Sequence, residues 1–176
     1  KDPVYLAAVC ITNGVIGAAL LDLSTGEFAA TQISAADCWA KLGELLDGYA
    51  PREVLFPAES AREIEQHLAR ASRQPSITAE GSSVSGSSLS AYSLCELENA
   101  DFDLKEATEG LCRQFGTREL AGSGLADKPS AVRAAGACLR YAHFTQKASA
   151  GHVSEIKYFE AADCLVQDQL TLRNLE

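Results

Sequence analysis

The fold is decided by residues 4–33, which read VYLAAVCITNGVIGAALLDLSTGEFAATQI. Three apolar runs, at residues 4–12, 14–22 and 27–33, are separated by Asn13-Gly14 and by Ser24-Thr25-Gly26. Both separators are typical of tight turns, because their residues adopt the backbone angles that such turns need. Short apolar runs joined in this way predict an antiparallel meander of three strands.

Residues 34–72 add helices and a strand to the meander. Ser34 is placed to cap a helix. The apolar side chains of that helix recur at three- and four-residue steps: Trp39, Leu42 and Leu46. Residues 52–56 are typical of a strand, and residues 59–72 have the period of a second helix.

The order of these elements defines the fold class. With a further short strand expected at residues 76–78, strands and helices alternate after the meander, which favours parallel additions to the sheet. The predicted fold is therefore α/β, a mixed sheet of three antiparallel strands plus parallel additions, flanked by helices. This order resembles the ribonuclease H-like topology.

The second half of the chain begins with a Gly/Ser-rich tract and continues as helices. We expect a flexible insertion at about residues 80–100, because the tract offers little apolar surface. A helix is predicted at residues 103–115 and ends at Gly116. The apolar stripe of this helix has four members: Leu104, Ala107, Leu111 and Phe115.

A longer helix follows, and the chain then returns to the sheet. Asp127 is placed to cap this helix, with Pro129 in its first turn, and AAGA at residues 134–137 permits close packing. Residues 155–167 are predicted to form a strand or hairpin. We assign residues 1–166 to one domain and residues 167–176 to the start of the next.

Composition excludes several classes of protein. The chain has 176 residues, of which 47% are hydrophobic and 22% charged, as in one globular domain. Its net charge of −9 is the wrong sign for a domain that grips nucleic acid by charge alone. The longest apolar run is too short for a membrane span, so no membrane partner is expected. The lack of Met and the start at Lys1 lead us to expect a fragment of a longer chain.

The six cysteines have no metal-binding or redox spacing. Wide gaps separate them, and most fall in apolar segments, so we expect reduced thiols packed as small hydrophobic groups. They are Cys10, Cys38, Cys95, Cys112, Cys138 and Cys164.

Two blocks of sequence carry a family resemblance. The C-terminal block contains QFG at 114–116, LAGSGL at 120–125, AAGA at 134–137 and LRNLE at 172–176. The N-terminal block is LDLSTGEF at 21–28. Together and in this order they resemble the MutS family of DNA mismatch repair proteins, and specifically its connector domain, whose sheet is ribonuclease H-like.

The resemblance implies a module that links the mismatch-binding domain to the core and ATPase domains. The implied partners are MutL, the other MutS domains, a second MutS subunit and, through the whole protein, mismatched DNA. ATP and Mg²⁺ would be cofactors of the whole protein only, and the implied location is cytoplasmic, with nucleoid association during repair. The chain itself would be neither an enzyme nor a cofactor-binding domain.

The resemblance also implies where MutL docks. The family's docking surface includes the exposed side of the helix before QFG, which corresponds here to residues 103–115. The expected exposed positions are Lys105, Thr108, Glu109 and Arg113. Gly110 is unusual in such a helix, and two explanations stay open: close approach of a partner, or drift.

The alternatives are a standalone ribonuclease H-like nuclease and an acidic regulatory domain that binds a small ligand. A nuclease would hold metal ions on carboxylates, and only Asp22 and Glu27 are close together. The Asp22 carboxylate is better explained as an acceptor for turn amides. His67, His143 and His152 lie on separate predicted elements without metal-ligand spacing, so we predict no catalytic or metal site.

Overall fold

The architecture is seen in a computed structural model, which describes residues 3–34, 36–73, 92–145 and 150–161. The strands are β1 (Tyr5–Thr12), β2 (Val15–Asp22), β3 (Phe28–Ile33), β4 (Glu53–Pro57), β5 (Ser93–Leu97) and β6 (Lys157–Tyr158). The α-helices are α1 (Cys38–Tyr49), α2 (Ala61–Arg73), α3 (Leu104–Phe115) and α4 (Pro129–Thr145). Short 3-10 helices are η1 (Ala58–Ser60), η3 (Asn99–Phe102), η4 (Ala121–Ser123) and η5 (Ala150–His152).

The described strands form one mixed sheet in the order β5-β4-β1-β2-β3-β6. The β1–β2 and β2–β3 pairs are antiparallel, whereas β4 joins β1, β5 joins β4 and β6 joins β3 in parallel. The predicted meander with parallel additions is therefore confirmed. Asn13 and Gly14 both have positive φ, at 52° and 79°, which is the geometry of the tight turn expected between β1 and β2.

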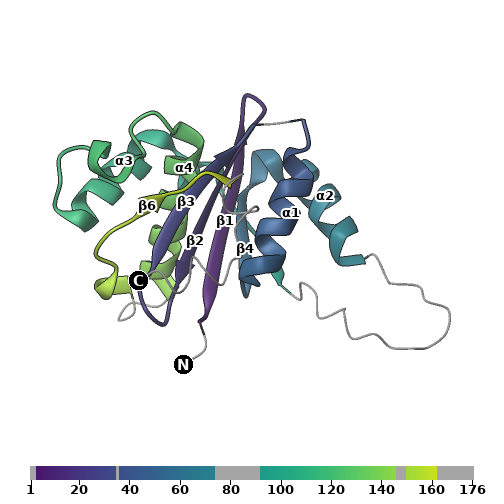
Figure 1. Cartoon of the computed structure of the whole chain (residues 1–176), viewed down its shortest axis with the longest axis horizontal. Coiled ribbons are helices and arrows are strands. Elements are labelled where there is room, and N and C mark those ends of the chain that lie inside the picture. The colour runs from purple at the N-terminus through teal and green to yellow at the C-terminus, as the bar shows by residue number, and fades with distance from the viewer. Residues whose placement is uncertain (1–2, 35, 74–91, 146–149, 162–176) are drawn as a thin grey trace.

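Two helical layers cover the sheet (Figure 1), with α1 and α2 on one face and α3 and α4 on the other. Side chains of β1 alternate between the two cores: Leu6, Ala8 and Cys10 face α4, and Tyr5, Ala7 and Val9 face α1 and α2. Both sets are buried, which explains why β1 and β2 are apolar at almost every position.

Small residues allow α4 to lie close to the sheet. A Cβ atom built on Gly17 of β2 would lie 2.0 Å from the carbonyl oxygen of Ser130 at the start of α4. The α4 side chains that face the sheet are mostly alanines, as the AAGA segment led us to expect. Close packing of α4 is therefore confirmed.

The helix starts differ from the sequence prediction. The first helix begins at Cys38, so Ser34 is not its cap, and the residue before it, Asp37, makes no side-chain capping bond. At the start of α4 the amides of Ser130 and Ala131 donate to Oε1 of Gln32, at 2.8 and 3.2 Å. A side chain from β3, rather than Asp127, therefore meets these amides, and such a tertiary cap leaves no local pattern in the sequence.

Two predicted segments also differ from those in the structure. Residues 93–97 form β5, paired with β4, so the expected insertion at 80–100 extends too far toward the C-terminus. Of the strand or hairpin predicted at 155–167, the described part holds only the two-residue strand β6. The expected strand at 76–78 and the domain boundary at 166 lie outside the described residues.

Candidate partner-binding surface

Helix α3 is a short, well-terminated helix. The Oδ2 atom of Asp103 accepts a hydrogen bond from the amide of Glu106 at 3.0 Å, which caps the N-terminus. Gly116 ends the helix in the left-handed conformation, with φ of 65°. The helix bounds and the Gly116 stop therefore agree with the sequence prediction.

The inner face of α3 packs tightly on α4. Ala107 and Leu111 are buried, and a Cβ atom on Gly136 of α4 would lie 2.3 Å from the Cβ atom of Ala107. Leu104, predicted to belong to the apolar stripe, is instead 44% exposed because it occupies the first turn, ahead of the contact with α4. The glycine at 136 thus sets how closely the two helices approach.

Polar contacts fix α3 at both ends. Near its start, Arg140 of α4 lies 3.6 Å from Asp101 in an ion pair. Near its end, Gln114 donates from Nε2 to the carbonyl of Val153 at 2.9 Å, and its Oε1 lies 2.8 Å from Nε2 of His143. The helix is therefore held by packing along its inner face and by polar contacts at its ends.

The outer face of α3 carries the residues predicted to contact a partner. Lys105, Glu109 and Arg113 are exposed and share one side of the helix at four-residue steps. Thr108, which was also expected to be exposed, is half-buried, and its hydroxyl donates to the carbonyl of Leu104 at 2.9 Å. Within the described parts of the chain, no ion pair joins the three charged side chains. Their charges are therefore available to a partner.

Gly110 lies on the outer half of this helix. A Cβ atom built there meets nothing within 4 Å, so no contact with the described residues accounts for the glycine. The two explanations for Gly110, a close partner or drift, therefore both stay open.

Asp22, one of the two carboxylates considered for metal binding, has another role in the β2–β3 turn. Oδ1 of Asp22 accepts hydrogen bonds from the Ser24 hydroxyl at 2.7 Å, the Ser24 amide at 2.9 Å and the Val4 amide at 3.1 Å. Burial would raise the pKa of Asp22, but these hydrogen bonds outweigh it and lower the pKa. The turn explanation for Asp22 is confirmed. No group of three or more potential metal ligands occurs among the described residues.

The histidines lie apart on different elements. His67 of α2 stacks on Trp39 of α1, with ring centroids 4.1 Å apart, and His143 contacts Gln114. His152 lies against Gly26, where a Cβ atom would come within 2.6 Å of the imidazole. Each of the three contacts stabilises packing between elements, and none brings two histidines together.

The thiols in the described residues are free cysteines. Burial raises the pKa of Cys10 to about 12, and it also raises the pKa of Cys138. A thiol with a raised pKa is a poor nucleophile at neutral pH, so these two act as packing groups. Cys164 lies outside the described residues.

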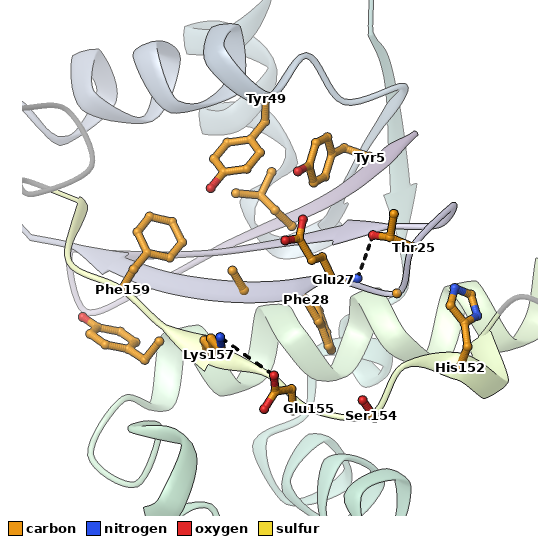
Figure 2. A pocket seen from close by; sticks show the side chains of 14 residues that line it. Tyr5, Thr25, Glu27, Phe28, Tyr49, His152, Ser154, Glu155, Lys157 and Phe159 are labelled. Atoms are coloured by element: carbon orange, nitrogen blue, oxygen red, sulfur yellow. Dashed lines mark hydrogen bonds and ion pairs between the residues drawn. The ribbon is translucent and has the colours of Figure 1, made fainter. Parts of the chain in front are cut away.

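A pocket at the β3–β6 edge of the sheet could not be predicted from the sequence. Figure 2 shows that its walls come from the start of β1, the β2–β3 turn, the end of α1 and the segment around β6. These segments are far apart in the sequence, so no local pattern could have indicated the pocket.

None of the helices in the described ranges has the length and apolar character needed to cross a bilayer.

The sheet order and the helices on both faces define a ribonuclease H-like α/β domain. Its described residues contain no assembled carboxylate centre of the kind that nucleases of this fold use. The family described as MutS domain II matches residues 4–156.

Several curated relatives match nearly the whole chain. DNA mismatch repair protein MutS of Symbiobacterium thermophilum is 36% identical over 172 residues, and MutS of Myxococcus xanthus is 38% identical over 174 residues. In both cases 98% of this chain is covered, but only 18% and 17% of the relative. The chain therefore belongs to the MutS family of DNA mismatch repair proteins, of which it carries domain II, the connector, and it spans less than a fifth of these relatives.

Proposed function

We propose that this connector contributes a docking surface for MutL, formed by the outer face of α3. The observation that carries the proposal is a helix held firmly on its inner face and at both ends, with Lys105, Glu109 and Arg113 exposed on its outer face. Charges on a fixed helix can meet a partner without the entropy cost of ordering the backbone.

In the whole protein the connector would join the mismatch-binding domain to the core and ATPase domains. That protein would bind mismatched DNA in the cytoplasm in an ATP-dependent way, with a second MutS subunit. ATP and Mg²⁺ would be held by another domain, and the connector would have no catalytic role of its own.

The connector would also relay the state of its neighbours. Such a relay needs two arrangements of the connector relative to the adjacent domains, with ATP and MutL favouring the same one. MutL would then bind more tightly to the ATP-bound protein, because ATP has already shifted the connector toward the arrangement that MutL favours.

The test of docking is a titration of this chain with the N-terminal domain of the cognate MutL, followed by a method sensitive to weak complexes. We expect saturable binding that is weakened about three- to tenfold by Lys105→Glu or Arg113→Glu. The matched control is Arg62→Glu, an equal charge reversal at an exposed position of α2, on the other face of the sheet. Absence of saturable binding, or equal weakening by the control, would contradict docking through α3.

A steric variant tests the same surface without altering charge. Gly110→Gln places a bulky side chain in open space and improves helix propensity, so the fold is kept. If MutL approaches this helix closely, Gly110→Gln should reduce the affinity at least as much as the charge reversals do. Unchanged affinity would mean that Gly110 reflects drift.

A further inference from the structure

Three charged side chains of alternating sign lie along the outer face of α3. Lys105, Glu109 and Arg113 follow one another at four-residue steps, so they form one row on the helix in the order basic, acidic, basic. At the rise of an α-helix, neighbouring members of the row are about 6 Å apart along the axis. These three residues, which we call the α3 charge row, therefore present a charge pattern with a defined spacing.

The α3 charge row is available to a partner. All three side chains are exposed, and among the described residues no ion pair or side-chain hydrogen bond engages them. Pairs at four-residue steps on an exposed helix are weak, so pairing inside the row would not compete with pairing to a partner. Glu106, the fourth charged residue of α3, lies with Gly110 in the neighbouring row and flanks these three. The charges of the row are therefore not used within the described part of the domain.

The order of the charges in the row distinguishes between partners. A uniformly acidic surface would attract Lys105 and Arg113 but repel Glu109, and a uniformly basic surface would repel two of the three groups. Only the order acidic, basic, acidic at the same spacing places an opposite charge against every member of the row. A partner displaced along the helix by one step would bring like charges together, so the alternation also selects the register of binding.

We infer that the segment of MutL that docks on α3 carries acidic, basic and acidic side chains in this order, about 6 Å apart. The two acidic groups pair with Lys105 and Arg113, and the basic group pairs with Glu109. Because Ala107 and Leu111 are buried on the inner face, the helix holds its charges in place, and pairing does not have to order the backbone. The inference rests on the proposed docking of MutL, to which it adds the chemistry of the partner's surface.

The test compares variants of the full 176-residue chain in a titration with the N-terminal domain of the cognate MutL at low salt. The main variant exchanges the first two charges, Lys105→Glu with Glu109→Lys, which keeps the composition and net charge of the row and changes only its order. We expect this exchange to weaken binding about tenfold or more, because two of the three pairs become like-charge contacts. Glu109→Lys alone should weaken binding about three- to tenfold, although it makes the row more basic.

The matched control is Arg62→Glu with Glu65→Lys, the same kind of exchange at two exposed positions of α2 on the other face of the sheet, and it should leave the affinity unchanged. Retained affinity of the Lys105→Glu, Glu109→Lys variant, or an affinity of Glu109→Lys equal to or above that of the unaltered chain, would overturn the alternating partner and leave docking through α3 in place. Absence of saturable binding by the unaltered chain, or equal weakening by the control, would instead overturn the docking proposal and this inference with it.

Discussion

The Asp22 side chain stabilises the β2–β3 turn through several hydrogen bonds. Its carboxylate receives bonds from both the amide and the hydroxyl of Ser24, and from the amide of Val4, which precedes β1. One acceptor therefore holds the β2–β3 turn and the entry to the sheet together. The turn at Asp22 could be predicted from the sequence because Asp, Ser and Gly favour turns. The hydrogen bond from Val4 could not, because it depends on the register of β1 against β2.

Replacing this carboxylate should make stability depend on pH in a defined direction. Asp22→Asn should cost about 1–3 kcal/mol of unfolding free energy at pH 7, because a charged acceptor of three hydrogen bonds becomes neutral. The folded pKa lies below the unfolded value of about 3.9, so the carboxylate's contribution is complete above that value and is lost as the pH falls through the folded pKa.

Urea unfolding of both proteins between about pH 2 and 7 checks this expectation. The difference between the wild type and Asp22→Asn should shrink below about pH 4. Glu44→Gln serves as the control for an exposed carboxylate, with an expected change within about 0.5 kcal/mol. A difference that stays constant down to pH 2 would show that the charge of Asp22 does not stabilise the fold.

At the scale of elements, the α3–α4 contact depends on where a glycine sits. Gly136 and Gly110 are both in helix interiors, yet a Cβ atom would collide with Ala107 at the first and meet open space at the second. Helix propensity alone would favour alanine at either position by about 1 kcal/mol. Only packing distinguishes them.

Gly136→Ala and Gly110→Ala should therefore change stability in opposite directions. We expect Gly136→Ala to lower the unfolding free energy by about 1–3 kcal/mol through overpacking, and Gly110→Ala to raise it by up to about 1 kcal/mol. Thermal and urea unfolding measure both changes. Adding Ala107→Gly to Gly136→Ala should recover part of the loss, and a stabilised Gly136→Ala would contradict the close contact.

Most elements were predictable because their signals are local. The turns at Asn13-Gly14 and Gly26, the meander and the caps of α3 follow from residues next to one another in the sequence. The Gln32 cap of α4 and the pocket beside Tyr49 could not be predicted from local patterns, because each joins residues from separate elements. For the candidate surface on α3, the helical period was enough to predict which charged positions face outward, whereas their binding role stays a prediction.

Arg133 joins the parts of the molecule at one end of the sheet. From α4 it donates to the carbonyl of Phe102, the hydroxyl of Thr12 and the carboxylate of Glu59. These partners belong to η3, the end of β1 and η1, so one guanidinium connects three separate segments to α4. Its side chain is only 15% exposed, which limits solvent screening of these contacts.

Loss of Arg133 should therefore weaken the whole domain. Arg133→Ala is expected to cost about 2–4 kcal/mol, because it leaves the Phe102 carbonyl and the Thr12 hydroxyl without this donor. Arg140→Ala, on the same helix, removes an arginine that is 60% exposed and should cost less than about 1 kcal/mol. Urea unfolding measures both losses, provided that the slope of unfolding free energy against urea concentration is unchanged. Equal losses in the two variants would show that Arg133 has no special connecting role.

The charge and surface of the whole molecule predict its state of association. The chain carries a net charge of −9, and among the described residues only Leu104 and Phe144 are large, exposed hydrophobic side chains. Like charges repel and isolated apolar side chains bury little area, so a stable dimer has little to hold it together. Light scattering at about 10–100 µM should give a mass near 18.7 kDa. A mass of twice that value at every concentration would contradict this expectation and would mean that a second copy covers an apolar face.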